Sequence, residues 1–120
     1  MQPLYGPRCI HDMLPYRVFN SILNDIEFTK YGDGDAIRDW LYVEDAVDAI
    51  FKIIYQNKDF DIFNIGTGIP TSTNKIISLC ENIAKKKLNI RQISSIRGDA
   101  HFAGVVDITK IFNETGWKFK

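Results

Sequence analysis

A glycine turn followed by an arginine and a carboxylate-rich segment constrains this chain more than any other feature. Residues 31–34 read Tyr-Gly-Asp-Gly, residues 38–40 read Arg-Asp-Trp, and residues 42–45 read Tyr-Val-Glu-Asp. Glycine allows the positive φ angles of tight turns, and carboxylates favour the first turn of a helix. The order therefore predicts a turn, a strand that presents an arginine, and a helix, all within fifteen residues.

Hydrophobic periodicity along the rest of the chain predicts alternating helices and strands. Helices are expected at residues 15–24, 44–56, 73–86 and 109–115. Strands are expected at residues 27–31, 61–65 and 90–96, with a short one at 105–106. The sequence has no internal repeat and no low-complexity tract. This alternation is typical of the α/β or the α+β class, and we predict the α/β class, with helices and short strands.

The predicted helix at residues 44–56 has the strongest apolar pattern. A broad apolar stripe is formed by Ala46, Val47, Ile50, Phe51, Ile53 and Ile54, and the aromatic Phe51 is expected in the core. Ser72 is the expected N-cap of the helix at residues 73–86. Asn24 is expected to provide the left-handed residue that ends the helix at residues 15–24.

Composition excludes several classes of protein. Fifteen basic and fifteen acidic residues cancel, which leaves no electrostatic footprint for nucleic acid. No apolar run approaches the roughly 20 residues that span a bilayer, so no membrane partner is expected. Two cysteines, Cys9 and Cys80, lack the spacing of a disulfide scaffold and are expected to be reduced. The expected location is the cytoplasm.

Three groups of residues allow both a functional and a structural interpretation. Residues 66–68 (Gly-Thr-Gly) lie where a dinucleotide loop would sit, but Thr71 replaces the third glycine and Pro70 stiffens the turn. A structural turn is favoured there. Structural interpretations are also favoured over a zinc site formed by Cys9, His11, Cys80 and His101, and over a metal or acid/base role for Asp33, Asp35, Asp39, Glu44 and Asp45. No metal is expected.

Four blocks, in order and with consistent spacing, resemble the C-terminal part of the NAD-dependent epimerase/dehydratase family, the extended short-chain dehydrogenases/reductases. They are Tyr-Gly-Pro-Arg at 5–8, residues 31–45, Phe-Asn-Ile-Gly-Thr-Gly at 63–68 with Ser72, and Arg-Gly-Asp at 97–99 with residues 107–110 and 116–118. The segment 8–16 is most similar to UDP-glucose and UDP-glucuronate 4-epimerases. The resemblance implies a C-terminal fragment of an extended Rossmann-type fold that binds a nucleotide sugar, and the similarity to this branch implies a UDP-sugar.

The resemblance also implies site residues. Arg38 matches a family arginine that contacts the diphosphate, and Arg97 is given the same role. Asp99 matches a carboxylate that accepts hydrogen bonds from the ribose. Tyr31 falls where the family places an aromatic residue beside the base. The family pattern Arg-Pro-Gly-Asp lacks its proline here, and one extra residue separates Asp99 from Asp107.

What the chain lacks shapes the functional prediction. The family's G-x-x-G-x-x-G cofactor loop and Tyr-x-x-x-Lys pair do not occur in this sequence. The full family enzyme uses NAD to oxidise the sugar at C4, whereas this chain alone is expected to hold no cofactor and no catalytic residue. Residues 4–120 are expected to form the substrate-binding domain and residues 1–3 the edge of a fragment. The alternatives are a non-catalytic nucleotide-sugar-binding remnant and one half of a split enzyme whose partner is a Rossmann half.

Overall fold

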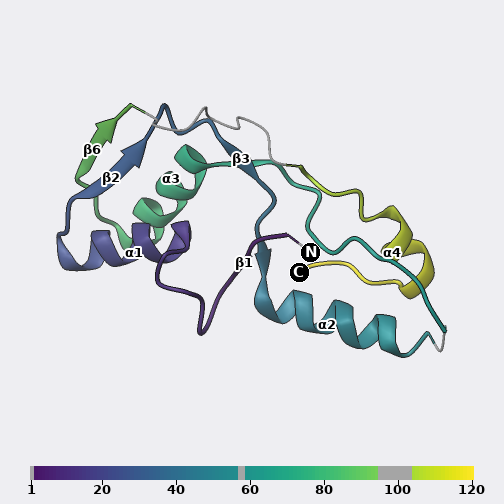
Figure 1. Cartoon of the computed structure of the whole chain (residues 1–120). Helices are drawn as coiled ribbons and strands as arrows, with labels where there is room; N and C mark the ends of the chain where they lie inside the picture. Colours follow the sequence, from purple (N-terminus) through teal and green to yellow (C-terminus); the bar gives the residue numbers. More distant parts are fainter. Residues whose placement is uncertain (1, 57–58, 95–103) are drawn as a thin grey trace. The chain divides into compact units, whose positions relative to one another are not determined.

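The computed structural model describes residues 2–56, 59–94 and 104–120, which form two compact units (Figure 1). Unit 1 comprises residues 1–8, 38–70 and 104–120, and unit 2 comprises residues 9–37 and 71–103. The boundary between the units falls within the two-residue strand β3 (Ile37–Arg38). Helices and strands alternate along the chain, so the predicted α/β class is confirmed. No helix of the described residues has the length and apolarity needed to cross a membrane.

The backbone of unit 1 is organised around one parallel strand pair. Strand β1 (Leu4–Tyr5) pairs with β4 (Leu41–Tyr42), with Leu4 opposite Leu41. The Leu41 N–H also donates to the Pro3 carbonyl at 3.0 Å, which extends the pairing toward the start of the chain. Helix α2 (Val43–Ile54) begins directly after β4, as the carboxylates of its first turn predict.

Helix α4 (Thr109–Thr115) has the predicted bounds and ends at Gly116, whose φ of 67° is left-handed. The Gly116 N–H donates to the Phe112 carbonyl at 2.8 Å. The chain then turns inward, and Trp117 is fully buried. The core of unit 1 consists of Leu41, Ala46, Ala49, Ile65, Ile111 and Trp117, with Leu4, Ile53, Phe63, Ile108 and Phe119 packed against it.

The predicted strand at residues 61–65 is wrong, because this segment is extended but not part of a ladder. Ile65 accepts a hydrogen bond from the Gln2 N–H at 3.2 Å. At Ile62, however, the N–H donates to the Asp61 carboxylate at 2.7 Å and the carbonyl accepts from Lys110 Nζ at 2.9 Å. Both polar backbone groups of Ile62 therefore bond to side chains and not to a neighbouring strand.

The apolar stripe of α2 is only partly buried, and the prediction that Phe51 lies in the core is wrong. Ala46 is fully buried and Ile53 packs against the core, whereas Val47, Phe51 and Ile54 are 46%, 54% and 63% exposed. The stripe is wider than one packing face. Helix α2 therefore has an inward apolar face and an outward one.

Unit 2 contains two helices, a second parallel strand pair and the two-residue strand β5. In chain order these elements are α1 (Leu14–Asn24), β2 (Phe28–Tyr31), β5 (Thr71–Ser72), α3 (Thr73–Ala84) and β6 (Ile90–Ile93). Strands β2 and β6 are parallel, with Phe28 opposite Ile90 and Tyr31 opposite Ile93. Helices α1 and α3 pack on each other (Figure 1). The buried side chains include Val18, Ile22, Phe28, Ile76, Ile77, Cys80 and Leu88.

The helix ends of unit 2 bear out one prediction and correct another. Ser72 caps α3, since its hydroxyl accepts the Lys75 N–H at 3.1 Å. Helix α1 does not end on a left-handed Asn24. Asp25 adopts that conformation with φ of 56°, while Asn24 Nδ2 donates back to the Asn20 carbonyl at 2.9 Å. The amide of Asn24 is satisfied by staying helical, so the left-handed position moves one residue further.

Candidate functional site

A buried carboxylate, Asp39, organises the glycine turn of unit 1. Asp39 is fully buried and follows Arg38 directly in the chain. Its Oδ1 accepts the Thr67 N–H at 2.8 Å and the Thr67 hydroxyl at 2.6 Å, and its Oδ2 accepts the Gly68 N–H at 2.9 Å. The Val106 N–H adds a longer bond of 3.4 Å. A buried carboxylate with several donors is well satisfied, and such charge-assisted bonds are among the stronger ones in proteins.

The same contacts decide what residues 66–68 can bind. A dinucleotide loop offers its backbone N–H groups to a pyrophosphate. Here the N–H groups of Thr67 and Gly68 donate to Asp39 instead. A glycine is needed at position 66 for packing and not for phosphate binding. A Cβ there would lie 2.7 Å from Asp39 Oδ2 and 2.4 Å from Val106 Cγ2. The turn fits an internal carboxylate and does not fit an NAD phosphate, which supports its structural interpretation.

The hydrogen bonds that hold Asp39 inward affect the direction of the neighbouring Arg38 side chain. Successive side chains of an extended segment point to opposite sides. With Asp39 held inward, Arg38 on β3 is directed to the other side, where it is half-buried. The predicted diphosphate ligand thus immediately precedes the buried and hydrogen-bonded Asp39.

In unit 2, the side chain of Asn74 holds the predicted Tyr-Gly-Asp-Gly turn. Asn74 Nδ2 donates to the Asp33 carbonyl and to Asp35 Oδ1, both at 3.1 Å, and its N–H donates to the Gly34 carbonyl at 3.0 Å. Lys30 Nζ adds bonds to the Asp33 carbonyl at 3.1 Å and to Asn74 Oδ1 at 3.3 Å. Asn74 lies in the first turn of α3. Its hydrogen bonds therefore link the start of this helix to the Tyr-Gly-Asp-Gly turn.

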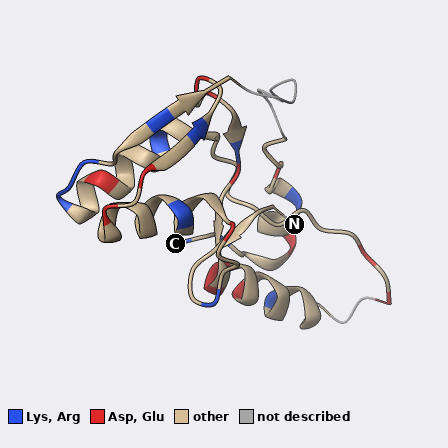
Figure 2. Cartoon of the chain, turned by 60° about the vertical axis from the view of Figure 1, so that its left-hand side comes forward, with Lys and Arg blue, Asp and Glu red and all other residues tan. Residues whose placement is uncertain are grey.

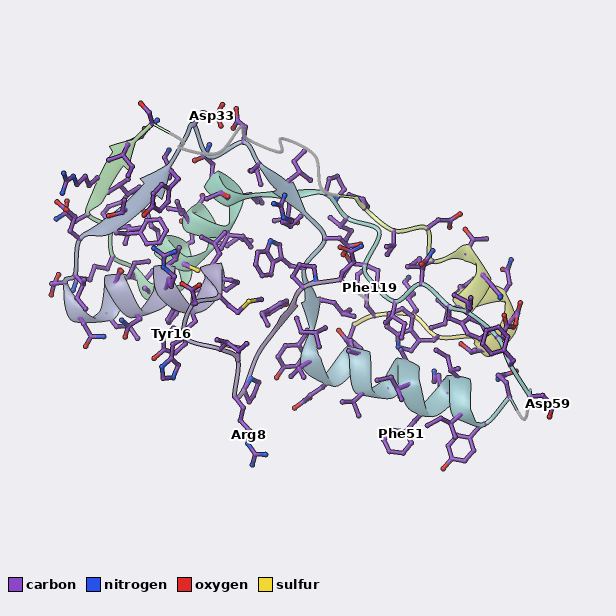
Figure 3. The ribbon with its side chains drawn as sticks, in the orientation of Figure 1. Arg8, Tyr16, Asp33, Phe51, Asp59 and Phe119 are labelled. Atoms are coloured by element: carbon purple, nitrogen blue, oxygen red, sulfur yellow. The ribbon has the colours of Figure 1, made fainter. Side chains whose placement is uncertain are left out.

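Tyr31 stands at the end of β2, immediately before this turn. Its side chain is 53% exposed, and the following Gly32 N–H donates to the Ile93 carbonyl at 2.9 Å. Gln92 Nε2 donates to the Gly32 carbonyl at 3.0 Å. The backbone around Tyr31 is therefore fixed while the residue remains half-exposed. Asp33, in the turn that follows Tyr31, is labelled in Figure 3.

The structure locates only part of the predicted site. Tyr31 belongs to unit 2, whereas Arg38 belongs to unit 1. Arg97 and Asp99, together with His101 of the hypothetical zinc site, lie outside the described residues. Within residues 2–56, 59–94 and 104–120, no group of three or more His, Cys, Asp or Glu side chains could hold a metal ion.

The acidic residues prove to have separate structural roles. Asp33 Oδ1 accepts the Asp35 N–H at 2.8 Å. A side-chain bond to the backbone two residues on is typical of an aspartate in a turn, as predicted for Asp33. Glu44 and Asp45 lie in the first turn of α2, also as predicted. The buried position of Asp39 and the role of Asn74 were not predicted. The sequence offered one signal for the burial of Asp39. This acidic residue lies between an arginine and an aromatic residue, just before the apolar Leu41.

Shifted pKa values occur away from the predicted site residues. Burial, followed by the nearby Asp45 carboxylate and Tyr42, raises the pKa of the Tyr5 phenol. Burial also raises the pKa of the Cys80 thiol, and both cysteines are free, as expected. A side-chain hydrogen bond from Lys87 and a backbone bond from Leu88 lower the pKa of Glu81.

Comparison with known proteins adds independent information. The NAD dependent epimerase/dehydratase family matches residues 1–66. A dTDP-glucose 4,6-dehydratase of Shigella flexneri is 32% identical over 123 aligned positions, covering 95% of this chain and 34% of that protein. The chain thus spans about a third of the length of this curated relative.

Two solved structures share the fold. UDP-glucose 4-epimerase of Thermotoga maritima, solved with UDP-glucose, has a TM-score of 0.89 and 29% identity over 99% of this chain and 39% of its own. UDP-glucuronic acid 4-epimerase of Bacillus cereus, in complex with UDP-glucuronic acid and NAD, has a TM-score of 0.88 and 27% identity over 99% of this chain and 38% of its own. The described fold is therefore a part of a larger Rossmann-type architecture.

Proposed function

The chain belongs to the NAD dependent epimerase/dehydratase family, and from that premise we propose that it is the nucleotide-sugar-binding portion of such an enzyme. The proposed ligand is a UDP-sugar and the proposed type is a 4-epimerase. The observation that carries the proposal is the match of nearly the whole chain to 4-epimerases whose structures contain UDP-sugars. The proposed binding domain is residues 4–120, with residues 1–3 at its edge.

The proposed roles follow from the chemistry of each side chain. A guanidinium presents forked donors that match the oxygens of a diphosphate, so Arg38 is assigned to that group. The adjacent Asp39 supports the assignment, because its buried contacts fix the backbone that carries Arg38. Tyr31, half exposed on a fixed backbone, is assigned to the base. Arg97 and Asp99 are assigned to the diphosphate and the ribose by resemblance alone.

Catalysis is proposed to need a Rossmann half that supplies NAD and the catalytic residues, either within a longer chain or as a partner. The glycine turn of unit 1 gives its N–H groups to Asp39, so it offers no place for NAD phosphates. We expect the 120-residue chain to show neither NAD binding nor turnover. Stoichiometric NAD in the purified chain, or conversion of UDP-glucose, would contradict this expectation. The proposed location is the cytoplasm, where free thiols such as Cys9 and Cys80 are typical.

Three alternatives to this proposal lead to different expected results. The sequence relative from Shigella flexneri is a dehydratase, so a dTDP-sugar dehydratase is the alternative enzyme. A non-catalytic remnant that retains nucleotide-sugar binding is the alternative without catalysis, and half of a split enzyme is a third possibility. Titration with UDP and with dTDP separates the two nucleotide classes. Addition of a Rossmann half from a family member separates the remnant from the split enzyme, since only the latter should gain turnover.

Substitution of Arg38 tests the central contact. Arg38→Ala should weaken UDP binding by about 1.5–3 kcal/mol, the range for a hydrogen bond to a charged group, when measured by calorimetric titration. Arg38→Lys should recover part of the loss, because an ammonium keeps the charge but not the fork. Arg91→Ala is the matched control, since Arg91 is 67% exposed and forms only a 4.0 Å ion pair with Glu27 among its described contacts. Equal UDP affinity in wild type and Arg38→Ala would remove Arg38 from the site.

A further inference from the structure

The buried Asp39 adjoins the arginine assigned to the diphosphate, and we propose that Asp39 is a positioning residue for Arg38. In this role the glycine turn at residues 66–68 acts on ligand affinity through Asp39, without a contact of its own with the ligand. The inference rests on the proposed nucleotide-sugar site. It extends that site to a segment 28 positions further along the chain.

The segment that leads away from Arg38 alternates in burial. Asp39 and Leu41 are fully buried, whereas Arg38 and Trp40 are half-buried. A period of two is typical of an extended chain, in which successive side chains point to opposite sides. The Leu41 N–H also donates to the Pro3 carbonyl at 3.0 Å. Two inward residues therefore hold the backbone that carries Arg38, and Asp39 is the nearer of them.

Asp39 links this backbone to two other segments of unit 1. Its Oδ1 accepts the N–H and the hydroxyl of Thr67, and its Oδ2 accepts the N–H groups of Gly68 and Val106. Each carboxylate oxygen thus has two described donors. A binding constellation has to be held to within about 0.5 Å by the contacts behind it. The bonds of Asp39 supply such a hold one residue away from the guanidinium.

Electrostatics alone disfavours a carboxylate at position 39. A negative charge one residue from Arg38 opposes the approach of a diphosphate, because like charges repel. Acidic and basic residues are interspersed along the described chain (Figure 2), and the fifteen of each kind cancel in the whole sequence. No net positive charge therefore offsets this repulsion. Loss of the charge should strengthen UDP binding, whereas loss of positioning should weaken it, so the two effects have opposite signs.

The substitution Asp39→Asn separates the two effects, because it removes the charge and keeps the shape. An amide offers one oxygen and one NH₂ group, so in either orientation the N–H of Thr67 or of Gly68 faces a donor. We expect the dissociation constant for UDP, measured by calorimetric titration, to rise about tenfold or more. Affinity for uridine, which lacks the diphosphate, should change less than about twofold in an NMR titration. A UDP dissociation constant that falls or stays the same would overturn the positioning role.

Two comparisons distinguish positioning from a general loss of stability. Ile111→Ala removes atoms from the core of unit 1 on α4, and should leave both dissociation constants within about twofold of the wild type. In an Arg38→Ala background, Asp39→Asn should change UDP affinity less than about twofold, because the arginine that it positions is absent. Additive effects of the two substitutions, or equal losses of UDP and uridine affinity, would overturn the inference.

A milder variant reaches Asp39 from the glycine turn and serves if Asp39→Asn does not fold. Thr67→Val removes the hydroxyl that donates to Asp39 Oδ1 at 2.6 Å and accepts the Ile69 N–H at 3.0 Å. It should raise the UDP dissociation constant about threefold, and Thr67→Ser, which keeps the hydroxyl, should recover most of the affinity. Wild-type UDP affinity in Thr67→Val would overturn the action of the turn on the ligand site.

The variant Arg38→Ala distinguishes failure of this inference from failure of the proposed site. If Arg38→Ala weakens UDP binding and Asp39→Asn does not, the positioning role is wrong and the nucleotide-sugar site stands. If neither substitution weakens UDP binding, or if the wild type does not bind UDP, the proposed site is wrong and the positioning role is overturned with it.

Discussion

Two glycine turns in this molecule perform the same structural task by opposite means. The turn at residues 66–68 in unit 1 is held by the carboxylate of Asp39, which is fully buried. The turn at residues 31–34 in unit 2 is held by the amide of Asn74, which lies at the surface. Each anchor reaches a segment far away in the sequence. The turns differ in the charge and in the burial of the group that fixes them.

The difference shows how burial determines the contribution of a hydrogen bond to folding stability. At the surface, water replaces a lost hydrogen bond, so the net contribution of one bond is about 1 kcal/mol. In the interior, hydrogen-bond donors that lose their acceptor find no water to replace it. The loss of folding stability therefore rises with each donor left unpaired. Asp39 is therefore expected to matter more to stability than Asn74. The following predictions test that ranking.

The largest effect is expected at Asp39. Asp39→Ala should lower the free energy of unfolding by about 2–4 kcal/mol, because it leaves the Thr67 and Gly68 N–H groups and the Thr67 hydroxyl without their acceptor. Urea denaturation measures the change. Asn74→Ala is the comparison and should cost about 1 kcal/mol. If the two substitutions cost the same, burial does not distinguish the two turns.

An intermediate effect is expected at Gly34. Its φ is 87°, and a Cβ there would lie 2.2 Å from Asn74 Oδ1. Gly34→Ala should cost about 2 kcal/mol, from left-handed strain together with displacement of the amide. Gly116→Ala isolates the strain, because Gly116 has a φ of 67° and a Cβ added there would meet no described atom within 4 Å beyond its chain neighbours; it should cost about 1 kcal/mol. In an Asn74→Ala background the two glycine substitutions should cost nearly the same, as a double-mutant cycle by thermal unfolding would show.

The smallest effect is expected at a surface ion pair of unit 2. Lys87 lowers the pKa of Glu81, so this pair stabilises the fold above the ordinary glutamate pKa of about 4.3 and loses that contribution as pH falls through the lowered value. Glu81→Gln should reduce the melting temperature slightly at pH 7 and have no effect near pH 2. The effect stays within about 1 kcal/mol because Lys87 is 89% exposed. A difference that grows on acidification would contradict this assignment.

The family resemblance, the α/β class and most helices could be predicted from the sequence because their signals are local. Helix α4 has the predicted bounds, and Ser72 caps α3 as its side chain implies. Periodicity and capping depend on residues within one or two turns, which the sequence displays directly. The four motif blocks are also read in order along the chain. The predicted site residues follow from those blocks and remain predictions.

Tertiary structure alone decided which polar groups meet and which apolar faces are covered. Asp39 and Thr67 are 28 positions apart, and no local pattern indicates that one would hold the other. The backbone of Ile62 is bonded to the side chains of Asp61 and Lys110, so an apolar segment that predicts a strand does not form one. The sequence predicts that Phe51 of helix α2 lies in the core, yet Phe51 is exposed. Periodicity records that a face is apolar, whereas only the packing partner determines whether water reaches it.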